Sequence, residues 1–247
     1  MVYLTYIVDN YETLADTTIF VHAHQVAYHN NDLLGSDMVR MLKRLNNQHV
    51  AEVGYFNLRC HLDPGCPDWL HMNASQENIN RKEEIIFPKI WDSLHPGKPL
   101  PDVLSHPCCS QIAASRARLQ SIPLSEWKRY QHWLSETDLS DEVSGRIWEY
   151  TWQYILTGLA ELCPPMHECY CQGYRVCFLS TQHMEAWFDL REGMRALEKE
   201  VGTFDERKQD ATELKRRIGN IKKMLDEQQA DAIRRGDELI ASEKSST

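Results

Sequence analysis

The chain has 247 residues, with 27 Lys and Arg against 36 Asp and Glu, which gives a formal net charge of −9. Without a net basic surface it has little to exchange for the counterions of nucleic acid, so we expect no nucleic-acid partner. It contains no run of 18 apolar residues, and residues 1–20 lack the pattern of a signal peptide. Composition therefore predicts no membrane segment, signal or anchor in this chain.

Composition changes near residue 180. The segment 183–247 holds 13 basic and 15 acidic residues, whereas all ten prolines and all eight cysteines precede it. We therefore predict a compact α/β domain over residues 1–180 and a charged helical tail over residues 183–247.

The chain begins with apolar residues at helical spacing, which predicts a first helix over residues 2–12. A strand is predicted next, over Thr17–Val21, because its residues are β-branched or aromatic. Strand alternation would place His22 and His24 on one face at the carboxyl end, where open α/β sheets place ligands. The alternative is one histidine hydrogen-bonded in the core and the other exposed.

The middle of the chain alternates helical and extended patterns. Ser36 is predicted to cap a helix whose apolar face is Val39, Leu42 and Leu45. Further elements are predicted as a strand over residues 52–59, a helix from Ser75 to Leu94 kinked by Pro88, a short strand pair or a strand and turn over 103–115, a short helix to Ser121 capped by Ser115, and a helix capped by Ser125. Within the strand pair, the adjacent thiols Cys108 and Cys109 cannot both face the core.

The helix predicted over residues 141–156 is rich in aromatic residues and carries Arg146 and Glu149 on one face. A carboxylate one turn from an arginine, among aromatic rings, is a candidate buried site. The alternative is a structural ion pair between these two side chains in an amphipathic core helix.

Six of the cysteines form three pairs, each six residues apart: Cys60 and Cys66, Cys163 and Cys169, and Cys171 and Cys177. This spacing suits short disulfide-closed loops, which hints at the secretory pathway. A structural zinc site built from the last four cysteines is the rival, although it lacks the usual two-to-four-residue spacing. Inert buried thiols are the third alternative.

The tail has two runs of apolar residues with four-three spacing, residues 190–204 and 214–225. We predict two helices that form an antiparallel pair or coiled coil, through which the chain self-associates. The break is expected at Gly202, followed by a capping box of Thr203 and Glu206. The alternative is a solvated helix of marginal stability.

Five segments in one order resemble the largely fungal family known as domain of unknown function 3431, over about residues 1–178. They are YLTYIVDNYETLADTTIFVHAH, VGYFNLRCHLDPGCP, CCSQIAASRARL, VSGRIWEYTW and CPPMHECYC. This family is linked by distant similarity to glycosyltransferases of the GT-A type. The resemblance implies a three-layer α/β domain that binds a nucleotide sugar and a glycan acceptor. Family members carry a leading strand before the first helix, so we expect a GT-A-like domain without its first strand.

The resemblance also suggests roles for particular residues. In GT-A enzymes a strand ends in a metal-binding motif that holds the diphosphate, and His22 and His24 occupy that place here. His29 and Asp32 would complete the ligand set. Glu149 would be the catalytic base, with Arg146 beside it offsetting charge. Because imidazoles favour Zn²⁺ and its neighbours over Mg²⁺, the identity of a divalent metal is left open.

Our leading hypothesis is therefore a glycosyltransferase-like domain that transfers a sugar from a nucleotide donor, with a truncated, inactive form of it left open. The alternative is a non-catalytic, disulfide-stabilised binding or interaction module whose helical tail drives assembly.

Overall fold

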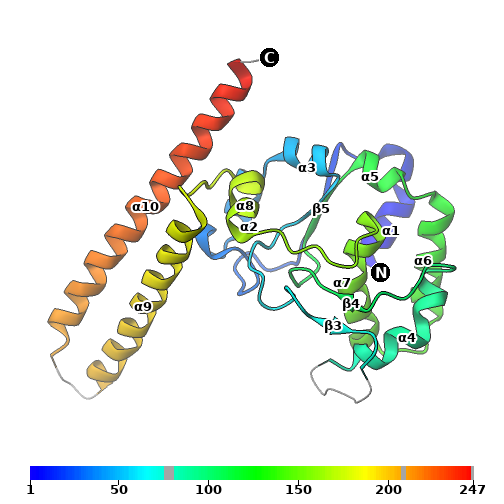
Figure 1. Ribbon diagram of the computed structural model, residues 1–247, viewed down its shortest axis with the longest axis horizontal. Helices are drawn as coiled ribbons and strands as arrows, with labels where there is room; N and C mark the ends of the chain where they lie inside the picture. Colours follow the sequence, from blue (N-terminus) through cyan, green and yellow to red (C-terminus); the bar gives the residue numbers. More distant parts are fainter. Residues whose placement is uncertain (75–80, 207–209, 246–247) are drawn as a thin grey trace. The chain divides into compact units, whose positions relative to one another are not determined.

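The computed structural model describes residues 1–74, 81–206 and 210–245, and it divides into two compact units, Met1–Pro164 and Pro165–Thr247. The fold is mixed α/β, with small sheets in the first unit and long helices at the C-terminal end (Figure 1). No helix among the described residues is long and apolar enough to cross a membrane.

A three-stranded sheet lies at the centre of the first unit, in the order β1 (Thr17–Phe20), β5 (Ile112–Ser115) and β2 (Tyr55–Asn57). Both outer strands pair antiparallel with β5, so β1 and β2 run parallel to each other. A second sheet pairs β3 (Leu70–His71) with β4 (Val103–Leu104). The predicted strand Thr17–Val21 is confirmed, but β1 ends at Phe20. Strand alternation therefore does not extend to the two histidines.

Helices cover this sheet and supply most of the core. They are α1 (Val2–Asp9), α2 (Met38–Arg44), α3 (Asn47–Val53), α4 (Glu83–Leu94), α5 (Arg116–Gln120), α6 (Leu124–Glu136) and α7 (Asp141–Thr157). Aromatic side chains join them to the sheet: the ring of Tyr3 on α1 lies 4.5 Å from that of Phe20 and 5.7 Å from that of Trp152. The core therefore includes the contact between β1, α1 and α7, and it extends to the other sheet strands and to α4, α5 and α6.

Several local predictions in this unit are wrong, including the Ser125 cap, since Ser125 lies inside α6 and Pro123 is the residue before it begins. Asp37, rather than Ser36, caps α2, because its carboxylate accepts hydrogen bonds from two backbone N–H groups of the first turn. The buried face of α2 contains Met38 and Met41, whereas Val39 is 43% exposed. The predicted strand over residues 52–59 is confirmed only at Tyr55–Asn57, because α3 continues through Val53. The predicted helix start at Ser75 lies outside the described residues.

The disulfide pairing also differs from the prediction. Cys66 is bonded to Cys163, 97 residues away, which excludes both the Cys60–Cys66 and the Cys163–Cys169 loops. The Cys171–Cys177 loop is confirmed. These pairings also rule out the zinc alternative in the oxidised chain. The adjacent residues Cys108 and Cys109 are bonded to each other, a pairing that the six-residue spacing of the other cysteines does not predict.

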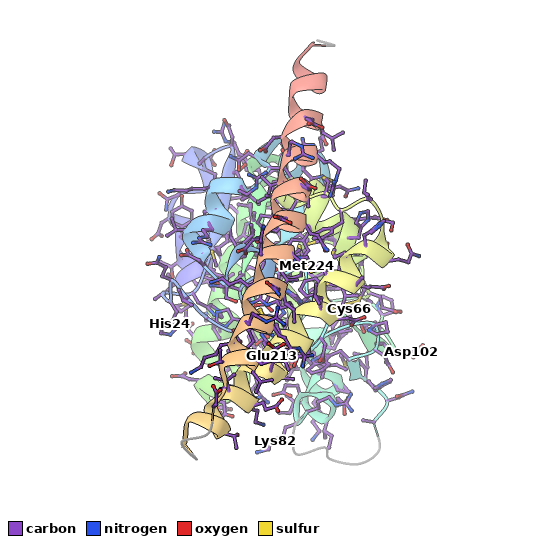
Figure 2. The ribbon with its side chains drawn as sticks, turned by 90° about the vertical axis from the view of Figure 1, so that its left-hand side faces the viewer. His24, Cys66, Lys82, Asp102, Glu213 and Met224 are labelled. Carbon is purple, nitrogen blue, oxygen red and sulfur yellow. A yellow bond between two sulfur atoms is a disulfide. The ribbon has the colours of Figure 1, made fainter. Side chains whose placement is uncertain are left out.

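The second unit begins with short turns, α8 (Met166–Glu168) and η3 (Cys169–Gly173), followed by α9 (Thr181–Glu206) and α10 (Thr212–Ser245). The last two helices run side by side in opposite directions (Figure 1). The indole of Trp187 donates a 3.0 Å hydrogen bond to the carbonyl of Leu225 and fixes their register. Glu213 lies in the first turn of α10, and Met224 lies further along the same helix (Figure 2).

The predicted break between the two tail helices is misplaced. Gly202 and Thr203 lie inside α9, which continues through Glu206. Asp210 precedes α10, and its carboxylate accepts a 2.9 Å hydrogen bond from the backbone N–H of Thr212. The side chains of residues 204–206, and with them part of the predicted capping box, lie outside the described residues.

Candidate functional site

A cavity of about 530 Å³ opens in the first unit between α1, α6, α7 and the segment that follows β1. The polar and aromatic residues that line it are Tyr3, His22, Ser110, Asp141, Ser144, Trp148, Glu149 and Trp152. Two of the residues predicted from the sequence, His22 and Glu149, therefore line one cavity. This volume is within the range of sites that hold small molecules.

Glu149 lies on α7, and a backbone group of the segment before β5 holds its carboxylate in place. Its Oε1 atom accepts a 2.7 Å hydrogen bond from the backbone N–H of Cys109. Burial raises the pKa of Glu149, although the hydrogen bond from Cys109 and the charge of Arg146 oppose that shift. A carboxylate with a raised pKa in a cavity is a stronger base than an ordinary carboxylate, which suits it to accepting a proton from a bound ligand.

Arg146 does not form its hydrogen-bonded ion pair with Glu149. Its guanidinium lies 3.1 Å from Oε1 of Glu83 on α4, and Glu83 is almost fully buried. The second oxygen of Glu83 has no hydrogen-bond partner within the described residues. Arg146 therefore balances two carboxylates by charge and directly contacts the one on α4.

Aromatic rings form one wall of the cavity. Trp148 and Trp152 are one turn apart on α7, with ring centroids 5.2 Å apart, and both are buried. The indole nitrogen of Trp148 has no hydrogen-bond partner in the part of the chain that the structure describes. Burial raises the pKa of the Tyr3 hydroxyl to about 12, so this ring stays neutral. The wall offers flat apolar faces with polar groups at their edges.

His22 contacts His29 rather than His24. Its Nδ1 atom lies 3.1 Å from Nε2 of His29, so one of the two rings donates to the other. Burial lowers the pKa of both imidazoles, and each is lowered further by neighbouring positive charge. The backbone N–H of His22 donates to the amide oxygen of the buried Gln111, which fixes this segment beside β5. The pair is therefore mostly neutral at pH 7.

The other predicted ligands lie away from the cavity. His24 is exposed at the periphery of the first unit (Figure 2). Asp32 accepts a 3.2 Å hydrogen bond from the hydroxyl of Ser36, and its backbone N–H donates to His61. Neither His29 nor Asp32 lines the cavity. Of the six predicted site residues, the structure thus places His22 and Glu149 in the cavity lining, and His29 contacts His22 from outside that lining.

The described residues do not assemble the metal site expected from His22 and His24. Across residues 1–74, 81–206 and 210–245, the ligand atoms of three potential metal-binding residues converge at one place, formed by Cys108, Cys109 and Glu149. The two sulfurs are bonded to each other there, so they are not thiolate ligands in this form. A divalent metal held by His22 and His24 does not fit this arrangement.

Sequence reasoning missed several residues of the site. Asp141 and Ser144 come from the first turn of α7, and Ser110 comes from the turn before β5. The sequence predicts aromatic rings around Glu149, but it assigns no role to any one of them. The one available signal was helical spacing, since Asp141, Gly145, Trp148 and Trp152 recur at three and four along the face that also carries Glu149.

The fold and the cavity together define a small mixed α/β domain with a carboxylate and aromatic rings around one opening. The chain belongs to the family described as protein of unknown function, DUF3431, whose model matches residues 1–172. No curated protein and no solved structure match the chain.

Proposed function

We propose that the cavity binds a sugar and that Glu149 is the base in a glycosyl transfer from a nucleotide donor. The observation that carries this proposal is the placement of a carboxylate of raised pKa beside a tryptophan wall in one cavity. Sugar rings present apolar C–H faces that stack on aromatic rings, and their hydroxyls bond to carboxylates. The resemblance to GT-A enzymes, which no solved structure tests, is a second support.

In this reaction the acceptor hydroxyl oxygen attacks the anomeric carbon of the donor. Its proton passes to Glu149, and the bond between the anomeric carbon and the diphosphate oxygen breaks, with the electron pair leaving on the diphosphate. The leaving group is anionic, so it favours the protonated form of a neighbouring imidazole. His22 is the imidazole on this cavity. Arg146 supplies a fixed positive charge close to the base.

Gly145 provides a direct test of where the ligand binds. It lines the cavity, and a Cβ atom added there meets no atom within 4 Å, so a larger side chain can enter the opening without a clash at its base. We expect Gly145→Phe to abolish sugar transfer or nucleotide-sugar hydrolysis across a donor panel, while Gly145→Ala keeps it. Equal activity in both variants would place the reaction elsewhere.

A second candidate is a non-catalytic, disulfide-stabilised interaction module that assembles through the α9–α10 hairpin as a coiled coil. Met224 on α10 is 48% exposed, and Leu214, Ile218 and Ile221 are only partly covered by α9. Self-association would cover this apolar surface. Sedimentation of the full chain tests it: Met224→Glu should weaken an oligomer, whereas Gln228→Glu, which adds the same charge at an exposed polar position, should not.

A further inference from the structure

The bonded pair Cys108–Cys109 lies next to Glu149, and nothing in the proposed sugar transfer uses it. The Sγ atoms of Cys108 and Cys109 and one carboxylate oxygen of Glu149 all lie within 4.8 Å of one another. The three atoms come from two different elements, the segment before β5 and the helix α7. Such convergence of two sulfurs and an oxygen is the donor set of a zinc site once the sulfurs are thiolates.

The backbone around the two cysteines is held by contacts that do not involve the sulfur–sulfur bond. The N–H of Cys108 donates to the carbonyl of Pro64 at 3.2 Å. The side-chain amide of the buried Asn57 donates to the carbonyl of Pro107 at 2.6 Å. The N–H of Cys109 donates to Glu149. These three bonds are expected to keep the segment in place when the sulfurs separate.

We propose that reduction of Cys108–Cys109 by a dithiol creates a binding site for one thiophilic divalent cation, with Cys108, Cys109 and Glu149 as ligands. A thiolate of the dithiol attacks one sulfur, and its second thiol then resolves the mixed disulfide. Two electrons and two protons pass to the cysteines, and the dithiol becomes a disulfide. Binding of the cation then displaces the two cysteine protons.

The distances suit a tetrahedral cation. Zinc binds thiolate sulfur at about 2.3 Å and carboxylate oxygen at about 2.0–2.2 Å, which separates neighbouring ligand atoms by roughly 3.5 Å. The two sulfurs must therefore move apart after reduction, and the proposal requires rotation about the side-chain bonds of the two cysteines to separate them. Because Ser110 and Glu149 line the cavity, water can reach a fourth coordination position.

The site would control the chemistry of the cavity, and this consequence alone rests on the proposed function. A cation bound to Glu149 holds its carboxylate in the charged form and removes it as a proton acceptor. The dithiol-reduced, metal-bound chain would thus lack its base, and the oxidised chain would retain it.

Cobalt is a suitable probe, because Co²⁺ bound to thiolate absorbs strongly and can be titrated by its spectrum. The full chain is reduced with a phosphine without oxygen, and native folding is checked by circular dichroism. We expect the reduced wild type to bind one more Co²⁺ through thiolate than the Cys108→Ser/Cys109→Ser double variant, and the oxidised chain to show no thiolate band. Glu149→Gln should weaken this Co²⁺ at least tenfold, whereas Glu142→Gln, at an exposed position on the same helix, should not.

Three results would overturn the proposal. They are equal thiolate-bound Co²⁺ in the reduced wild type and the double variant, an unchanged affinity in Glu149→Gln, and loss of the native spectrum on reduction of Cys108–Cys109 alone, as assigned by peptide mapping. None of these readouts depends on sugar transfer, so the metal site and the proposed function fail separately.

Discussion

The backbone N–H of Cys109 donates a 2.7 Å hydrogen bond to Oε1 of Glu149 and so ties the turn before β5 to α7. A hydrogen bond to the charged form lowers a carboxyl pKa, yet the pKa of Glu149 remains raised. Burial therefore outweighs the hydrogen bond. The bond orients the carboxylate while the surroundings keep it basic.

Glu149→Gln should become more stable relative to the wild type as the pH rises. The folded pKa of Glu149 lies above its ordinary value, so the folded state favours the protonated carboxyl and loses stability as pH rises through that pKa. Glutamine keeps the acceptor for Cys109 and cannot ionise. Thermal unfolding at pH 4 and pH 8 checks this, with Glu142→Gln as the control. A stability difference that does not change with pH would contradict the assigned shift.

His95 should make the protein sensitive to acid. Burial lowers its pKa from 6.5 to about 4, and the charges of Arg129 and Lys98 add to this. The unfolded chain binds the proton first, so stability falls as the pH drops from 6.5 toward 4. Between pH 7 and pH 5 the loss from this group should be about 2 kcal/mol.

The measurement is denaturant unfolding of the wild type and His95→Phe at both pH values. Phenylalanine keeps a ring against Trp91 and Tyr154, whose centroids lie 4.3 and 4.9 Å from that of His95. The variant should lose about 2 kcal/mol less than the wild type.

The Cys66–Cys163 bond should stabilise the first unit more than Cys171–Cys177 stabilises the second. Their sequence separations are 97 and 6 residues, so loop entropy predicts about 4.7 and about 2 kcal/mol respectively. Paired serine variants, compared by denaturant unfolding, measure the two contributions. Non-reducing peptide mapping tests the pairing itself, and a peptide that joins Cys60 to Cys66 would contradict it.

Two glycines of α10 should respond in opposite directions to alanine. A Cβ atom at Gly236 would overlap the carbonyl oxygen of Arg175, whereas one at Gly219 meets nothing within 4 Å. Gly219→Ala should raise stability by about 1 kcal/mol through helix propensity. Gly236→Ala should lower it, because the backbone near Arg175 must move. Thermal unfolding that showed stabilisation in both variants would mean that this close approach is absent.

Regular apolar spacing was sufficient to predict most of the helices, including α1, α7 and the two long helices of the second unit. It was not sufficient to place the face of α2, because the set with Val39 and Leu42 and the set with Met38 and Met41 are both helical stripes. The partners that decide between them come from other elements. The end of α9 was misplaced for a similar reason, since Gly202 is tolerated inside a helix packed against α10.

The sequence predicts those site residues that follow from a local residue pattern. It does not predict contacts between residues that lie far apart in the chain. His22 and Glu149 were both identified from the sequence, and they line one cavity. The partner of Arg146 is Glu83, which lies 63 residues earlier in the chain, and no spacing rule connects them. The hydrogen bond from Cys109 to Glu149 spans 40 residues and depends in the same way on the tertiary fold.

The most direct test of the central claim is turnover by Glu149→Gln compared with Glu142→Gln. Both substitutions remove one carboxylate from α7, but only Glu149 lines the cavity. Each variant and the wild type are assayed for release of nucleoside diphosphate from a panel of nucleotide sugars, with and without glycan acceptors. A base that accepts the acceptor proton contributes typically 10²–10⁴-fold, so Glu149→Gln should lose at least about a hundredfold while Glu142→Gln stays near the wild type. Wild-type turnover in a folded Glu149→Gln protein would contradict the account.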